Sequence, residues 1–163
     1  MRIGCPAGDH LISSHCLRVG SGRRLLQDRH IAVFFYGLFM DAQALRARGM
    51  NPQAERPARL DGFTLRIGKR ATLVPDAAAC VHGILMDLTH AEIDALYSDP
   101  SVQVYRAEAV LAKPTGAAQV AALCFNLPYP PDASERNPDY AARLGELARR
   151  LGLPADYVAR VTG

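Results

Sequence analysis

An apolar run that ends in a tyrosine and a glycine is the part of this sequence with the clearest chemical use. Residues 31–35 predict a buried strand, and Tyr36-Gly37 follows it directly. Because glycine has no Cβ, backbone amides at such a turn can approach a ligand closely. Residues 38–45 then begin a helical stretch, so the junction could hold an anion on backbone N–H groups. A turn with only a structural role would have the same local sequence.

Other residues of types that often act in catalysis lie where structural roles are expected. Cys80 and Cys124 are in apolar, strand-like segments, which favour buried free thiols over reactive nucleophiles. His82 alternates out of an apolar strand and His90 follows a helix start, so we expect both to face solvent. No nucleophile-elbow, phosphate-loop or dinucleotide motif occurs in the sequence.

Residues 1–30 are predicted to be a flexible basic leader that precedes one domain, residues 31–163. The leader has no hydrophobic periodicity and no apolar stretch typical of a secretory signal. Four of its side chains are of the zinc-ligand types: Cys5, His10, His15 and Cys16. No two of them have a usual short ligand spacing, and adjacent residues are poorly placed to bind one ion. We therefore expect no metal.

Composition predicts a soluble globular domain. The chain has 163 residues, of which 49% are hydrophobic and 21% are charged. Its net charge of +3 comes entirely from the leader, so the domain is neutral and nucleic-acid binding is not expected. No apolar run reaches the roughly 18 residues that cross a bilayer, so no membrane partner is expected. The sparse cysteines and the excess of arginine over lysine favour a cytoplasmic protein from a bacterium.

Hydrophobic patterning predicts several short strands. Residues 63–67 alternate with period two, and the turn signal Pro75-Asp76 is expected to end a strand that begins at Ala71. The turn at 113–116 is expected to join a hairpin. The predicted strands are 31–35, 63–67, 71–74, 81–86, 105–111 and 119–125.

The helix signals are fewer and more local. Thr89 and Glu92 have the spacing of a capping box, which predicts a helix to about Tyr97. Asn137 followed by Pro138 is a typical helix start. Two further helices are thus predicted, over 138–151 and 156–161. Because strands outnumber helices and cluster into hairpins, the predicted fold class is α+β with a mixed or barrel-like sheet.

Several motifs between residues 31 and 161 occur in an order that points to a known family. They are FYGLFM at 35–40, ATLVP at 71–75, VHGIL at 81–85, the capped helix at 88–96, Tyr105-Arg106, and the stretches 138–140 and 152–158. Together they resemble the gamma-glutamylcyclotransferase-like (AIG2-like) family. The resemblance implies a small barrel made by a mixed sheet, with a few flanking helices.

The resemblance also implies a chemistry. Substrate would be bound at Tyr36, Gly37, Leu38 and Phe39, the counterpart of the family's YG(S/T)L loop, and at Tyr105. The α-amino group of a gamma-glutamyl amine or peptide attacks its own γ-carbonyl, which releases the amine and forms 5-oxoproline. Because the attack is intramolecular, the protein mainly fixes geometry and moves one proton. A glutamate in an acidic loop moves that proton in the family, and no cofactor is implied.

This chain departs from the family pattern at that acidic loop. Tyr97 stands where an aspartate is expected, and Pro100 stands where the catalytic glutamate is expected. Asp99 is the nearest candidate for the catalytic role, although it is one methylene shorter and is constrained by the proline that follows. A solvated turn residue is the alternative for Asp99. Glu108 is a second candidate, but strand alternation places it on the face opposite Tyr105.

Two functions therefore remain open from the sequence. In the first, the protein is an enzyme that cyclises a gamma-glutamyl-like small molecule, with Asp99 or another group moving the proton. In the second, it is a non-catalytic protein that binds such a ligand or an interaction partner on the same fold. Leu38, in place of the hydroxylated residue of the YG(S/T)L loop, removes one polar contact and favours a more apolar ligand. A monomer or a homodimer is expected.

Overall fold

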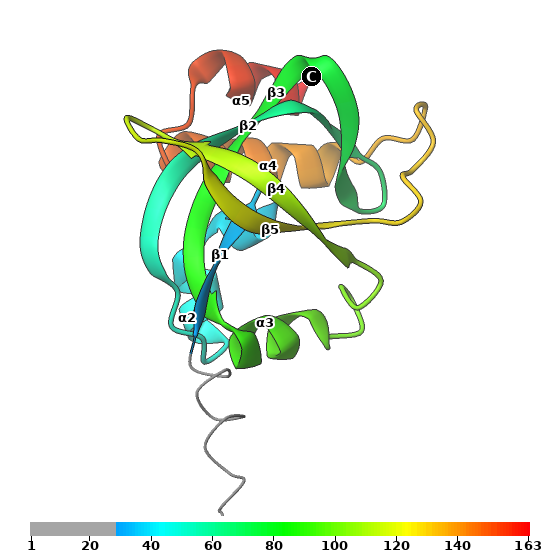
Figure 1. Cartoon of the computed structure of the whole chain (residues 1–163). Coiled ribbons are helices and arrows are strands. Elements are labelled where there is room, and N and C mark those ends of the chain that lie inside the picture. The colour runs from blue at the N-terminus through cyan, green and yellow to red at the C-terminus, as the bar shows by residue number, and fades with distance from the viewer. Residues whose placement is uncertain (1–28) are drawn as a thin grey trace, which may run out of the picture.

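The computed structural model describes residues 29–163 and shows a closed barrel of five strands with helices outside it (Figure 1). The order of the strands around the barrel is β1-β3-β2-β4-β5, and β5 closes it by pairing in parallel with β1 at Val33 and Leu123. The elements are β1 (His30–Phe35), η1 (Leu38–Met40), α2 (Ala42–Ala47), β2 (Gln53–Ile67), β3 (Ala71–Thr89), α3 (His90–Tyr97), β4 (Arg106–Pro114), β5 (Val120–Asn126), α4 (Pro138–Arg150) and α5 (Ala155–Thr162). The predicted α+β barrel is confirmed.

The predicted leader, residues 1–30, lies almost wholly outside the described residues, and so do the four candidate zinc ligands within it. Among residues 29–163, no three His, Cys, Asp or Glu side chains are grouped in a way that could hold a metal ion. In the same range, no helix is both long enough and apolar enough to span a bilayer.

One long antiparallel hairpin, β2 and β3, makes much of the barrel. The prediction that Pro75-Asp76 ends a strand is wrong, because β3 continues from Ala71 to Thr89 along β2. Pro75 and Asp76 instead begin a bulge in β3. Asp76 Oδ1 accepts from the Ala78 N–H at 3.1 Å, as in a turn, and the pairing register of β2 with β3 shifts between Asp61 and Phe63. The first half of β2, residues 53–62, was not predicted, because it is polar and contains Pro57.

Two buried polar side chains join β5 to β3 inside the apolar core. The Asn126 Oδ1 accepts from the Leu73 N–H at 3.3 Å, and its Nδ2 donates to Glu108 Oε2 at 2.9 Å. Thr72 Oγ1 accepts from the Leu127 N–H at 3.0 Å. Both of these buried side chains thus have hydrogen-bond partners, which stabilises the closure of the barrel beside the end of β1.

The predicted helix starts are confirmed atom by atom. The Thr89 N–H donates to Glu92 Oε2 at 2.8 Å while the Glu92 N–H donates to Thr89 Oγ1 at 3.3 Å, which is a complete capping box for α3. The Asn137 Oδ1 accepts from the Tyr140 N–H at 3.0 Å at the start of α4. Figure 1 shows α3 at one end of the barrel and α5 at the other, with α4 along its side.

Candidate functional site

A cavity of about 480 Å³ opens beside the turn that follows β1. Tyr36, Gly37, Leu38 and Phe39 line one part of it, and Tyr105 lines another. The structure therefore brings together the five residues that the sequence predicted to bind substrate. The cavity is in the size range of roughly 300–1,000 Å³ that is typical of small-molecule sites.

The turn itself is held by β1 and by α4. Phe34 pairs with Leu85 of β3, which fixes the end of the strand in the core. After it, the Met40 N–H donates to the Gly37 carbonyl at 3.0 Å and closes η1. A Cβ on Gly37 would lie 2.8 Å from the Tyr140 Oη of α4, so glycine is needed here for close packing.

The sequence predicts that backbone N–H groups at the start of the helix after the turn could hold an anion. In the structure, the N–H groups at the start of α2 already have a partner. The helix α2 begins only at Ala42, and its first amides are capped by Asp41, whose Oδ1 accepts from the Gln43 N–H at 3.0 Å. The other carboxylate oxygen of Asp41 accepts from Arg150 Nη2 at 2.6 Å. An acidic side chain thus already occupies this helix terminus.

Aromatic side chains form one wall of the cavity. The rings of Tyr97 and Phe125 stack with centroids 3.6 Å apart and planes at 10°, and Phe39 meets Tyr97 edge-on at 6.5 Å. Two hydroxyls in the lining are already engaged, since Tyr36 Oη donates to the Phe125 carbonyl and Tyr105 Oη donates to the Ala71 carbonyl, each at 2.6 Å. Tyr97, at the position where the resemblance to the family implied an aspartate, is part of this wall.

Burial keeps these phenols neutral. Desolvation is the main cause that raises the pKa of Tyr36 and the pKa of Tyr97 well above the usual tyrosine value. Burial likewise raises the pKa of Tyr105. Because each hydroxyl stays protonated and two of them already donate to carbonyls, none is placed to accept a proton from a ligand.

Basic side chains make the remaining rim positive. Arg48, Lys69, Arg70 and Arg143 line the cavity, and no acidic side chain of residues 29–163 does. None of the four is in an ion pair with a carboxylate of the described chain. The sequence did not reveal this cluster, because its members are far apart in a domain whose net charge is neutral.

The candidate catalytic residue Asp99 lies outside the lining. Its Oδ1 accepts from the Ser101 N–H at 2.8 Å and from Ser101 Oγ at 2.6 Å, and these hydrogen bonds lower the pKa of Asp99. Pro100 is exposed, whereas Ser101 and Val102, the next residues, do line the cavity. Glu108, the second candidate, is exposed on β4 and accepts from Asn126. The structure therefore brings neither carboxylate to the predicted binding residues.

The histidines and cysteines behave partly as predicted. His90 is exposed, but the prediction that His82 faces solvent is wrong: its ring packs against Tyr157 at 5.2 Å, and burial lowers the pKa of His82. Cys124 is fully buried, and burial raises the pKa of its thiol to about 12. Cys80 is only half-buried, because it lies at the bulge in β3.

A sequence model of the family described as gamma-glutamyl cyclotransferase, AIG2-like, matches residues 33–142. The chain belongs to this family. The matched range includes the turn at Tyr36, nearly all of the barrel and the start of α4, so it contains every residue that lines the cavity except Arg143.

Solved structures of the gamma-glutamyl cyclotransferase fold agree with this assignment. An uncharacterized human protein is similar at a TM-score of 0.69 and 18% identity over 83% of this chain and 88% of its own. A structure titled gamma-glutamyl cyclotransferase has the same TM-score and identity, over 82% of this chain and 87% of its own. A yeast gamma-glutamyl cyclotransferase specific to glutathione has a TM-score of 0.62 at 12% identity, over 83% and 95%. A search of curated proteins finds no match.

Proposed function

We propose that this member of the gamma-glutamyl cyclotransferase family binds a small anionic ligand of the gamma-glutamyl class and does not cyclise it. The observation that carries the proposal is the lining of the cavity beside the Tyr36-Gly37 turn, called the first cavity below. It combines an aromatic wall with four basic side chains, and no acidic side chain of residues 29–163 lines it. Such a lining attracts a carboxylate and offers no base for the proton that cyclisation must move.

The ligand class follows from the family and from the charges. Gamma-glutamyl compounds have a free α-carboxylate, and related proteins of this fold are named for acting on gamma-glutamyl substrates. Arg70 and Arg143, which line the cavity, are suited to a carboxylate because a guanidinium can bind both of its oxygens. Tyr97 and Phe39 provide an apolar surface for the rest of the ligand. The amine portion is therefore expected to be apolar or aromatic.

Turnover would need a group that the cavity does not present. The α-ammonium must lose a proton before it attacks, and the departing nitrogen must gain one. Guanidinium groups cannot accept the first proton, and the hydroxyls of Tyr36 and Tyr105 already donate to backbone carbonyls. The protein would hold the ligand in a reactive geometry without completing the reaction.

A second candidate function is cyclisation of the ligand with Asp99 moving the proton, and one observation favours it. Asp99 is only two residues from Ser101, which lines the cavity, so a rearrangement of this turn could bring its carboxylate to the ligand. That movement would break both hydrogen bonds between Asp99 and Ser101. The two candidates therefore differ in whether Asp99 matters.

The test is to incubate the protein with a panel of gamma-glutamyl amino acids and amines while following 5-oxoproline and the thermal midpoint. We expect a saturable rise in the midpoint without 5-oxoproline. Arg70→Gln should weaken binding about tenfold, because it removes a charge-assisted hydrogen bond. Arg149→Gln, on an exposed ion pair with Glu146 outside the cavity, is the matched control and should change nothing.

Three outcomes separate the candidates. Binding without product supports the proposal. Formation of 5-oxoproline that Asp99→Asn abolishes would replace it with the enzymatic candidate. If no member of the panel either shifts the midpoint or is turned over, the cavity does not bind gamma-glutamyl compounds and both candidates fail.

A further inference from the structure

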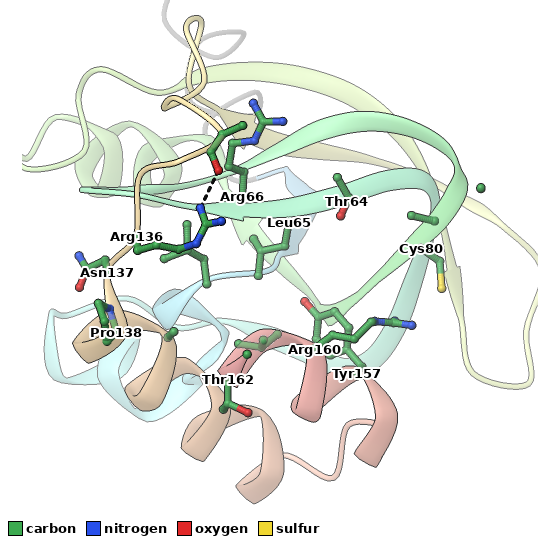
Figure 2. Close-up of a pocket in the computed structure, with 17 residues that line it drawn as sticks. Thr64, Leu65, Arg66, Cys80, Arg136, Asn137, Pro138, Tyr157, Arg160 and Thr162 are labelled. Atoms are coloured by element: carbon green, nitrogen blue, oxygen red, sulfur yellow. Dashed lines mark hydrogen bonds between the residues drawn. The ribbon is translucent and has the colours of Figure 1, made fainter.

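A second cavity of about 750 Å³ lies between the β2–β3 hairpin and the helices α4 and α5 (Figure 2). It shares no lining residue with the first cavity. Leu65 of β2, Ala141 of α4 and Val161 of α5 form apolar walls. In the close-up, Leu65 points from the strand toward the helices, so the space lies between the two layers.

One buried polar group in this cavity has no partner. The Tyr157 side chain of α5 is 3% exposed, and its Oη makes no hydrogen bond within the described chain. Figure 2 shows its ring reaching from α5 toward the strands, and the ring packs against His82 at 5.2 Å. Burial raises the pKa of Tyr157, so the hydroxyl is a neutral donor. A buried donor without an acceptor is uncommon in folded proteins and indicates that something else accepts from it.

Arginine side chains line the cavity around this hydroxyl. The Arg160 guanidinium lies 5.7 Å from the Tyr157 ring centroid, and Figure 2 shows Arg136 at the opposite end of the cavity. Arg136 donates to the Ala133 carbonyl at 2.6 Å, which satisfies a donor without neutralising the charge. Arg160 has only an exposed ion pair with Asp156 at 3.7 Å, a contact that contributes little. No acidic side chain of residues 29–163 lines the cavity.

We propose that this second cavity binds a small organic anion with an apolar body. Its acid group would accept hydrogen bonds from the Tyr157 hydroxyl and from the Arg160 guanidinium, which come from the same helix one turn apart. Its apolar body would lie against Leu65 and Val161. The inference is independent of the function proposed for the first cavity, because none of the residues it uses lines that cavity.

The test uses octanoate as the probe and octan-1-ol as its neutral counterpart, with binding measured by titration calorimetry on the full chain. Octanoate should bind saturably and octan-1-ol should not. Arg160→Gln should weaken octanoate binding about tenfold or more, since a hydrogen bond to a charged group is lost. Tyr157→Phe should weaken it about fivefold without lowering the thermal midpoint of the free protein, because it removes an unpaired buried hydroxyl. Arg149→Gln, outside the cavity, is the matched control.

Cys80 provides a second readout, because it lines this cavity and is half-buried, whereas Cys124 is fully buried. In a Cys5→Ser/Cys16→Ser background, octanoate should slow the reaction of Cys80 with a disulfide reagent, and octan-1-ol should not. Absence of saturable binding would overturn the proposal, as would equal affinities of Arg160→Gln and Arg149→Gln. An affinity that responds to Arg70→Gln but not to Arg160→Gln would place octanoate in the first cavity and would also overturn it.

Discussion

Replacement of Gly37 by alanine should destabilise the protein, and removal of the Tyr140 hydroxyl should reverse most of that loss. The backbone of Gly37 has φ −110° and ψ −158°, an extended conformation that alanine adopts without strain. The obstacle is the new Cβ, which would lie 2.8 Å from Tyr140 Oη and has no other heavy atom within 4 Å beyond its chain neighbours. One atom of one side chain therefore accounts for the expected effect.

The magnitude follows from that contact. The Cβ and the Oη must separate by about 0.6 Å to reach ordinary contact distance, and overpacking on this scale costs about 1–2 kcal/mol. Tyr140→Phe alone removes a half-buried hydroxyl, which we expect to cost about 1 kcal/mol. In the double variant the contact is gone, so its loss of stability should be close to that of Tyr140→Phe alone. The expected coupling is about 1–2 kcal/mol.

The assay is urea denaturation of the wild type, both single variants and the double variant, with the free energy of unfolding taken from each transition. Gly37→Ala combined with Tyr157→Phe is the control, because Tyr157 contributes a different buried hydroxyl on α5 and these two changes should be additive. If Gly37→Ala and Tyr140→Phe are additive within about 0.5 kcal/mol, the packing of α4 on the turn is not what requires glycine there.

Three further predictions concern groups around the barrel. Tyr36→Phe should lower the free energy of unfolding in urea by about 1–2 kcal/mol, because the buried Phe125 carbonyl loses its donor; an unchanged value would contradict this. Cys124 should resist a thiol reagent at pH 8 in the folded protein and react in urea, since burial raises its pKa to about 12. Glu92→Ala should cost about 1 kcal/mol at pH 7 by removing the capping box. Burial raises the Glu92 pKa, but hydrogen bonds from Thr89 and Asn51 outweigh it and lower the pKa below 4.5. The contribution of Glu92 is therefore present above pH 4.5 and lost as the pH falls through its folded-state pKa, so the wild type and the variant should converge in urea titrations at low pH.

Predictions that rest on neighbours in sequence agree with the structure. The capping box of Thr89 and Glu92, the start of α4 at Pro138 and the strand before Tyr36 each depend on a few adjacent residues. In such cases the hydrogen-bonding partners are encoded side by side, so the pattern identifies both of them. These elements were enough to predict an α+β fold with a mixed or barrel-like sheet, and the resemblance to the family implied the small barrel.

Predictions that needed a partner from elsewhere in the chain were wrong or incomplete. Pro75-Asp76 has the chemistry of a turn, but pairing with β2 continues across it, so it makes a bulge. The outcome was decided by the opposite strand, which no local pattern describes. His82 faces Tyr157 for the same reason, because α5 folds back over β3.

The motifs of the sequence by themselves indicated the family and its barrel, and the five residues predicted to bind substrate do line one cavity. That Pro100 stands at the position of a catalytic glutamate stays a prediction from the resemblance. Only the tertiary structure decided the electrostatics of the site. Four basic residues of a neutral domain converge on the first cavity, while Asp99 turns toward Ser101 outside it. Charge at a site depends on distances between residues that are remote in sequence, and those distances are set by the closure of the barrel and the packing of α4 against it.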